Sequence, residues 1–283
     1  MFIRDTFLEK ETTLSFEIFP PKSNETLFNI IEELKNFDPG FISVTYGAGG
    51  SSKDRTVEIA SIIKNKYSIE ALAHLTCITS TKEEIEEVVE NLKVNKIENI
   101  LALRGDIPEK FTIGKEHLYR YGKDLINKLK IDTNLCIGAA AYPEGHNECK
   151  DLDMSVRYLK EKVDAGADFL ITQLFFDNNN FFKFKEKMYK YNIRVPVTVG
   201  IMPAINKILI EKIQKLSGFI IPDKVKNFMN KYENNEEDLK KAGIEYASYQ
   251  IEELLQNKVE GVHLYTMNKP DIVKSILDNV SFK

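Results

Sequence analysis

The first clear strand signal in this 283-residue chain is Leu14-Ser15-Phe16-Glu17-Ile18-Phe19-Pro20-Pro21. Its apolar residues are almost continuous, which is typical of a parallel strand that is covered on both faces. Glu17 is the exception, because a carboxylate isolated from water costs several kcal/mol unless it is paired or faces a ligand. Polar residues recur in the same way near the ends of later apolar runs, so we search those ends for function.

Seven further apolar runs follow, separated by segments with helical periodicity. We expect strands at about 14–19, 41–46, 70–77, 99–105, 136–142, 168–176, 195–201 and 261–266. A regular alternation of strand and helix predicts parallel pairing with right-handed crossovers. Eight such units are typical of a closed (β/α)8 TIM barrel, for which about 250 residues is a common length.

The whole chain, residues 1–283, is predicted to form one α/β domain, because no Ser/Gly/Pro-rich linker divides it. We assign the surplus over a minimal barrel to an N-terminal extension at 1–12 and a helical insertion at about 222–235. An open doubly wound sheet is the alternative, and the lack of a G-x-G-x-x-G turn after any strand counts against it. The Gly-rich segment 47–53 lacks the register of a phosphate loop, which favours a βα loop at the barrel mouth.

Composition and charge exclude several classes of partner. The chain has 39 basic and 43 acidic side chains, a net charge of −4, and no Lys/Arg block of the kind that nucleic acid binding requires. No apolar run reaches the roughly 20 residues that cross a bilayer, and no signal peptide is evident. We therefore expect a cytoplasmic protein without nucleic acid or membrane partners.

The three cysteines are scattered, and His146 with Cys149 alone is weak evidence for a metal, so we predict no metal site.

Catalytic groups of a TIM barrel come from the C-terminal ends of several strands and from the loops that follow them. Side chains alternate along a strand, so Ser15 and Glu17 share one face. Six strand ends should in this way direct polar side chains to one mouth, namely Glu17, Thr45, His74, Arg104 with Asp106, Tyr142 and Gln173. Each alone could be structural, for example Glu17 as an ion-pair partner of Arg104, but their convergence favours a site.

Two carboxylates of this set have different surroundings. Glu17 is flanked by Phe16 and Ile18, so desolvation should disfavour its charged form and suit it to general acid catalysis. Asp106 follows Arg104 closely and should stay ionised beside that cation. We therefore expect one proton donor and one fixed negative charge.

At these residues the chain resembles the methylenetetrahydrofolate reductase family, FAD-containing barrels that reduce 5,10-methylenetetrahydrofolate to 5-methyltetrahydrofolate. The resemblance lies in nine segments that occur in family order and span nearly the whole chain, at 15–22, 43–48, 73–77, 103–106, 141–146, 162–167, 171–176, 200–203 and 263–268. It implies a TIM barrel enzyme of one-carbon metabolism and methionine biosynthesis. It also implies ping-pong hydride transfer from NAD(P)H to the folate through flavin N5.

The resemblance implies a role for most of the polar set. Glu17 matches the general acid that protonates the N10 side as the imidazolidine ring opens, and Asp106 matches a carboxylate beside the flavin. The matches to FAD-contacting positions are Thr45, Tyr46, Ala48, His74, Arg104, Gly105, Asp106, Ala140, Tyr142, His146 and Lys162. The matches to folate-contacting positions are Glu17, Asp106, Gln173, Tyr265 and Lys269.

Three positions depart from the family pattern. Ser155 and Glu161 stand where some bacterial members have an Asp and a basic residue that contact FAD, so this part of the cofactor site should be rearranged or weaker. Ile213 stands where some relatives stack an aromatic ring on the folate, and an aliphatic contact is expected instead.

Two alternatives to an NAD(P)H-dependent reductase stay open. One is the same flavin barrel as the folate-reducing subunit of a complex with a protein electron donor. The other is a flavin-free pterin-binding barrel, such as a methyltransferase domain. Neither the electron donor nor the oligomeric state follows from the residues, so a homo-oligomer and a partner subunit are both compatible with them.

Overall fold

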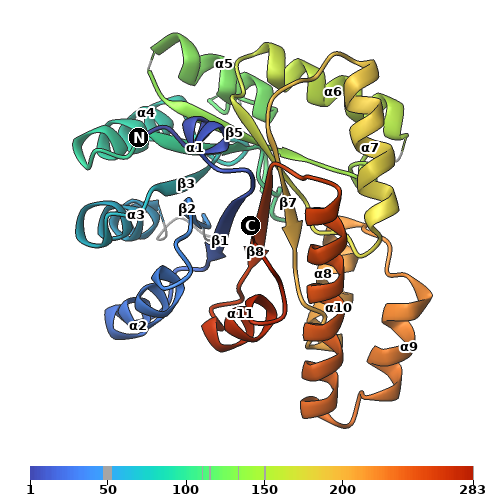
Figure 1. Cartoon of the computed structure of the whole chain (residues 1–283). Coiled ribbons are helices and arrows are strands. Elements are labelled where there is room, and N and C mark those ends of the chain that lie inside the picture. The colour runs from blue at the N-terminus through green and yellow to red at the C-terminus, as the bar shows by residue number, and fades with distance from the viewer. Residues whose placement is uncertain (47–52, 110, 115, 133, 150, 283) are drawn as a thin grey trace.

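In the residues that the structure describes, eight parallel strands close into a barrel (Figure 1). This computed structural model describes residues 1–46, 53–109, 111–114, 116–132, 134–149 and 151–282. The strands are β1 (Thr13–Ile18), β2 (Phe41–Val44), β3 (Ala71–Thr76), β4 (Asn99–Leu103), β5 (Cys136–Ala141), β6 (Phe169–Thr172), β7 (Val197–Ile201) and β8 (Gly261–Tyr265). Each strand pairs with the next in chain order, and β8 pairs with β1. The predicted (β/α)8 fold is confirmed.

Helices alternate with the strands and cover the outside of the barrel (Figure 1). They are α1 (Ile3–Glu9), α2 (Asn24–Lys35), α3 (Lys53–Tyr67), α4 (Lys82–Val94), α5 (Gly122–Asp132), α6 (Leu152–Asp164), α7 (Asn178–Lys190), α8 (Lys207–Ser217), α9 (Asp223–Lys231), α10 (Glu236–Gln256) and α11 (Pro270–Leu277). Local sequence signals set several starts. At α4, Thr81 Oγ1 accepts a hydrogen bond from Glu84 N, and the Glu84 carboxylate accepts one from Thr81 N, which together form a capping box.

The surplus residues lie in two places. The N-terminal helix α1 packs across the N-terminal end of the barrel, where Ile3 joins a buried cluster that includes Phe41, Leu72 and Phe169. The connection from β7 to β8 holds α8, α9 and α10, which form the orange group in Figure 1. Of these, α10 contacts α7 and α11 and so takes the outer-ring position, while α9 lies within the range assigned to an insertion.

The sixth strand is shorter than its apolar run. A strand was expected over 168–176, but β6 ends at Thr172. The backbone N–H of Gln173 still bonds to Ala141 O, whereas that of Leu174 bonds to the Gln173 side chain and leaves the ladder. Leu174 and Phe176 are buried because they pack beside α8 and α9 in a separate apolar cluster.

The interior of the barrel changes from apolar to polar along its axis. Phe41, Leu72 and Phe169 fill the N-terminal end. Toward the C-terminal end, which we call the mouth, the register places Glu17 beside Ser43 on β2 and Tyr265 on β8. The fold therefore presents buried polar groups at the mouth. In the described part of the chain, no helix is both long enough and apolar enough to span a bilayer.

Candidate functional site

The mouth of the barrel centres on the side chain of Glu17, which is 8% exposed. Two imidazoles face its carboxyl group: His74 Nε2 lies 3.6 Å and His263 Nε2 lies 3.9 Å from Glu17 Oε2. Burial lowers the pKa of His74 to about 4, so this ring is neutral at pH 7. Among the described residues, His74 Nε2 has no hydrogen-bond partner. Within the part of the chain that the structure describes, Arg104 forms its ion pair with Glu148 and not with Glu17.

Tyr265 and Gln173 are held at the same mouth by hydrogen bonds. The Tyr265 hydroxyl donates to Thr172 O at 2.8 Å. Burial, with the nearby charge of Glu17, raises the pKa of Tyr265 well above its usual value and keeps it a neutral phenol. Gln173 Nε2 donates to Ser217 Oγ at 3.3 Å. The Gln173 carboxamide therefore connects β6 to the end of α8, close to the mouth.

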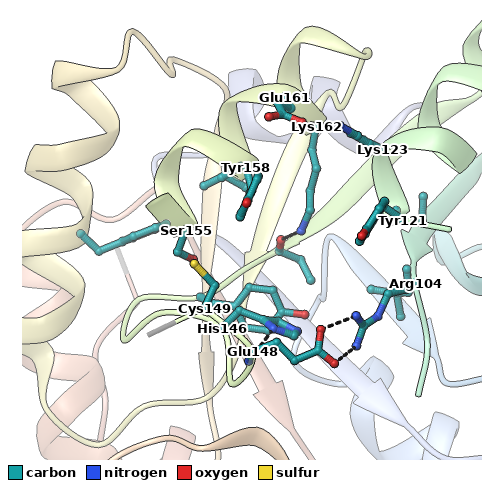
Figure 2. Close-up of a pocket in the computed structure, with 17 residues that line it drawn as sticks. Arg104, Tyr121, Lys123, His146, Glu148, Cys149, Ser155, Tyr158, Glu161 and Lys162 are labelled. Atoms are coloured by element: carbon teal, nitrogen blue, oxygen red, sulfur yellow. Dashed lines mark hydrogen bonds and ion pairs between the residues drawn. The ribbon is translucent and has the colours of Figure 1, made fainter. Parts of the chain in front are cut away.

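Beside the mouth, between β4, β5, α5 and α6, lies a cavity of about 390 Å³ that we call the β4–β5 pocket (Figure 2). Its lining includes Ala102, Arg104, Tyr121, Lys123, Ala140, Tyr142, His146, Glu148, Ser155, Tyr158, Glu161 and Lys162. Tyr142 and His146 form an edge-to-face pair with ring centroids 4.7 Å apart. Tyr265 lies near both Glu17 and Tyr142, so the pocket and the mouth adjoin.

Two cations of the β4–β5 pocket have different partners. The Arg104 guanidinium makes a bidentate ion pair with Glu148, at 2.6 and 2.9 Å, and this holds the pKa of Glu148 below its usual value (Figure 2). Lys162 Nζ donates to Ala140 O at 2.9 Å, and no carboxylate of the described residues forms an ion pair with it. Burial, followed by repulsion from Arg104, lowers the pKa of Lys162 to about 8. A half-buried cation without an ion-pair partner is a feature that an anionic group such as a diphosphate would satisfy.

The rim of the pocket holds two of the three residues that depart from the family pattern, and the third, Ile213, packs against the apolar cluster beside α8 and α9. Glu161 on α6 forms an ion pair with Lys123 on α5, and Ser155 is buried on the same helix (Figure 2). The negative charge of Glu161 is therefore balanced from the neighbouring helix. Sequence reasoning missed Lys123 and Glu148, because both lie outside the strand ends that it searched.

The remaining candidate residues lie around these two parts. Gly105 has φ of +84°, and a Cβ there would meet Thr76 Cβ at 2.9 Å, so only glycine fits this turn after β4. Asp106 and Lys269 are exposed. Thr45 and Tyr46 directly follow β2 and are half-buried, and burial raises the pKa of Tyr46.

The structure thus brings together many of the expected side chains. Those in the β4–β5 pocket are Arg104, Ala140, Tyr142, His146 and Lys162, and those facing Glu17 are His74 and Tyr265. Ala48 lies outside the described residues. No group of three or more His, Cys, Asp or Glu side chains in the described residues is placed to hold a metal ion.

Comparison with known proteins is consistent along the whole chain. Residues 3–281 match the family model of methylenetetrahydrofolate reductase. Methylenetetrahydrofolate reductase 1 of Schizosaccharomyces pombe is 34% identical over 280 residues, which are 96% of this chain and 46% of the yeast protein. The 5,10-methylenetetrahydrofolate reductase of Escherichia coli is 35% identical over 272 residues, which are 95% of this chain and 90% of the bacterial one. The chain thus spans about half the length of the yeast relative and most of the bacterial one.

Among solved structures, an uncharacterized protein from Clostridium thermocellum that binds two copies of 5-methyl-5,6,7,8-tetrahydrofolic acid has the same fold. Its TM-score is 0.68 at 18% identity, with 98% of this chain and 96% of that chain covered. At that identity the likeness establishes the architecture alone.

Proposed function

The chain belongs to the methylenetetrahydrofolate reductase family, and on that premise we propose that it reduces 5,10-methylenetetrahydrofolate to 5-methyltetrahydrofolate, with FAD as cofactor and NAD(P)H as hydride donor. One observation carries the proposal. A buried carboxyl group, that of Glu17, stands at the barrel mouth beside a pocket that contains Lys162, a half-buried cation with no ion-pair partner among the described residues. The product is a methyl-bearing folate, so the reaction belongs to one-carbon metabolism and would serve methionine biosynthesis.

The state of Lys162 supports the fit of the β4–β5 pocket residues to FAD. Desolvation disfavours its charged form, and the diphosphate of the cofactor would offset that cost by binding the ammonium. Arg104, Tyr142 and His146 would contact FAD with it, and Gly105 would let the backbone approach closely. Thr45, Tyr46, His74, Ala140 and Asp106 complete the proposed cofactor contacts among the described residues. When bound, FAD supplies the hydride chemistry between NAD(P)H and the folate.

The role of Glu17 follows from the chemistry of the substrate. Opening the five-membered ring of 5,10-methylenetetrahydrofolate breaks the bond to N10, and N10 must then accept a proton. Glu17 provides a buried carboxyl group at the mouth, and its neighbours His74 and Tyr265 are neutral. A carboxyl group held in this way is suited to general acid catalysis.

Folate recognition is assigned to the groups around Glu17. Gln173 would contact the pterin and Tyr265 would contact the folate toward its tail, because their hydrogen bonds fix both side chains at the mouth. Asp106 would provide a negative charge beside the pterin. Lys269 is an exposed cation after β8 and suits the carboxylates of the folate tail. In the proposed ping-pong order, NAD(P)H leaves before the folate binds.

Anaerobic stopped-flow measurements on the purified protein would test this proposal. We expect visible flavin absorbance that bleaches with NADH or NADPH and recovers when 5,10-methylenetetrahydrofolate is added. A colourless protein that cannot be reconstituted with FAD would favour the flavin-free pterin-binding barrel. A yellow protein that only a protein donor can reduce would favour the subunit of a complex.

A further inference from the structure

The turn at 266–268, which we call the β8 turn, lies against the end of β1 just after Glu17. The ladder between β1 and β8 ends with Glu17 opposite Tyr265. The residues that follow include Pro20 and Pro21, which have no N–H to donate, so β1 cannot extend the ladder. Beyond this point, side chains of the β8 turn make the contacts with the β1 segment.

Thr266 binds the main chain of Glu17 itself. The residue is 3% exposed, and its Oγ1 donates to Glu17 O at 2.7 Å, while Thr266 N donates to the same oxygen at 3.3 Å. Asn268 N donates to Thr266 Oγ1 at 3.1 Å. Because an amide N–H can only donate and a carbonyl oxygen can only accept, these partners fix the direction of the hydroxyl hydrogen.

The Asn268 carboxamide pairs with both main-chain groups of Phe19. Phe19 N donates to Asn268 Oδ1, and Asn268 Nδ2 donates to Phe19 O, both at 2.9 Å. The turn reaches this position through two consecutive left-handed residues, Met267 with φ of +53° and Asn268 with φ of +56°. Such backbone is costly for residues other than glycine and persists where surrounding contacts hold it. We call the four hydrogen bonds from Thr266 and Asn268 to Glu17 and Phe19 the β1 clip.

The carboxyl group of Glu17 depends on the main chain for its position. The imidazole nitrogens that face it, His74 Nε2 and His263 Nε2, lie 3.6 and 3.9 Å away, beyond hydrogen-bond length, and no hydrogen bond within the described residues holds this carboxyl group. A general acid must come within about 2.6–3.2 Å of the atom that it protonates. A displacement of about 1 Å can cost on the order of 100-fold in rate. The contacts that fix the main chain at Glu17 therefore bear on its use as an acid.

We propose that Thr266 and Asn268 are positioning residues for the general acid: the β1 clip fixes the end of β1 and thereby aims the Glu17 carboxyl group at N10 of the folate. Both residues act through the main chain of β1. This inference rests on the proposed function, since it deepens the role of Glu17.

Thr266→Val tests the clip at nearly constant side-chain size, and Thr6→Val is the matched control. Thr6 is also 3% exposed, and its Oγ1 donates to Ile3 O at 2.7 Å, but it lies on α1 at the opposite end of the barrel. Each variant loses one buried hydrogen bond, so both should lower the Tm by about 2–4 °C. Only Thr266→Val should slow folate reduction, by about 10- to 100-fold at saturating folate, while NAD(P)H still bleaches the flavin at the wild-type rate. Thr266→Ser keeps the hydroxyl and should restore most of the rate.

Asn268→Gly tests the other half of the clip and carries the test if Thr266→Val does not fold. Glycine adopts positive φ freely, so this variant loses the carboxamide without gaining backbone strain. Folate reduction at saturating folate should fall about tenfold with flavin reduction unchanged.

Amide hydrogen exchange of the FAD-free protein gives a readout that does not depend on activity. The Phe19 amide, which donates to Asn268 Oδ1, should exchange at least about tenfold faster in Asn268→Gly than in the wild type. The amide of Thr45, which donates to Ile18 O on the other side of β1, should keep its protection.

The outcomes separate this inference from the proposed function. Equal exchange of the Phe19 amide in Asn268→Gly and the wild type would overturn the role of the clip while Glu17 stays the acid. The same holds if Thr266→Val slows folate reduction no more than Thr6→Val does, or slows both half-reactions equally. Full folate reduction in Glu17→Gln would overturn both the acid and the clip.

Discussion

Replacing Lys162 by Met should have opposite effects on the stability of the FAD-free protein and on its affinity for FAD. Burial and Arg104 lower the pKa of Lys162 from 10.5 to about 8, so below pH 8 the folded protein holds an ammonium that would prefer water. The folded state binds fewer protons than the unfolded state between these two values. The free energy of unfolding of the wild type without FAD must therefore rise with pH across this window, and that of Lys162→Met lacks this rise.

The size of the effect follows from the same pKa shift. Between pH 7 and pH 10 the linkage relation gives a relative gain of at most about 2.5 kcal/mol for the wild type over Lys162→Met. The pocket is open to solvent on one side, and screening by water reduces this to about 1–2 kcal/mol. The lost hydrogen bond to Ala140 O adds an offset that is the same at both pH values, so it cancels in the comparison. Loss of a charge-assisted contact should weaken FAD binding by about 10- to 100-fold.

Urea unfolding of the FAD-free proteins at pH 7 and pH 10 measures the stability difference, and titration of FAD fluorescence measures the affinity. Lys123→Met is the matched control, because Lys123 is a lysine of the same pocket that is already paired, with Glu161, and is 43% exposed. It should show no comparable dependence on pH. If the stability difference between Lys162→Met and the wild type is the same at both pH values, the buried-cation argument is wrong. Unchanged FAD affinity in Lys162→Met would remove this residue from the cofactor site.

Three further substitutions test other groups of the site. Glu17→Gln should lower folate reduction by about 10²- to 10⁴-fold while NAD(P)H still bleaches the flavin, and an equal loss in both half-reactions would contradict an acid role. Asp106→Asn should raise the flavin potential and weaken folate reduction, since a negative charge is lost; an unchanged potential in spectroelectrochemical titration argues against contact with the flavin. Glu161→Gln should tighten FAD binding by up to about fivefold at low salt, because it removes a negative charge and releases Lys123, and weaker binding would refute that reading.

The fold could be predicted from local patterns because each strand and helix carries its own signal. Apolar runs of the kind at Leu14–Phe19 mark strands that are covered on both faces, and their regular alternation with helices leaves few topologies. The end of β6 could not be predicted in this way. Leu174 and Phe176 are apolar because of their contacts beside α8 and α9, and an apolar residue does not reveal which neighbour buries it.

Strand alternation also predicted which side chains face the mouth, and the structure places one of them, His74, beside Glu17. Tyr265, which the family resemblance indicated, lies near Glu17 as well. Their roles in catalysis stay predictions. The sequence segments that resemble the family indicated a folate reductase, which composition and spacing alone would not have named.

Contacts between residues far apart in the chain could not be predicted from the sequence. Arg104 pairs with Glu148, 44 residues away, and His263 meets Ser15 across the seam where the last strand joins the first. Such contacts depend on closure of the barrel and on the path of each loop over the mouth. No short segment of sequence determines either of them. Local sequence therefore determined the elements and the inward-facing residues. The charge balance of Arg104 and Lys162 arose from packing between distant segments, because electrostatics depends on distance in space rather than along the chain.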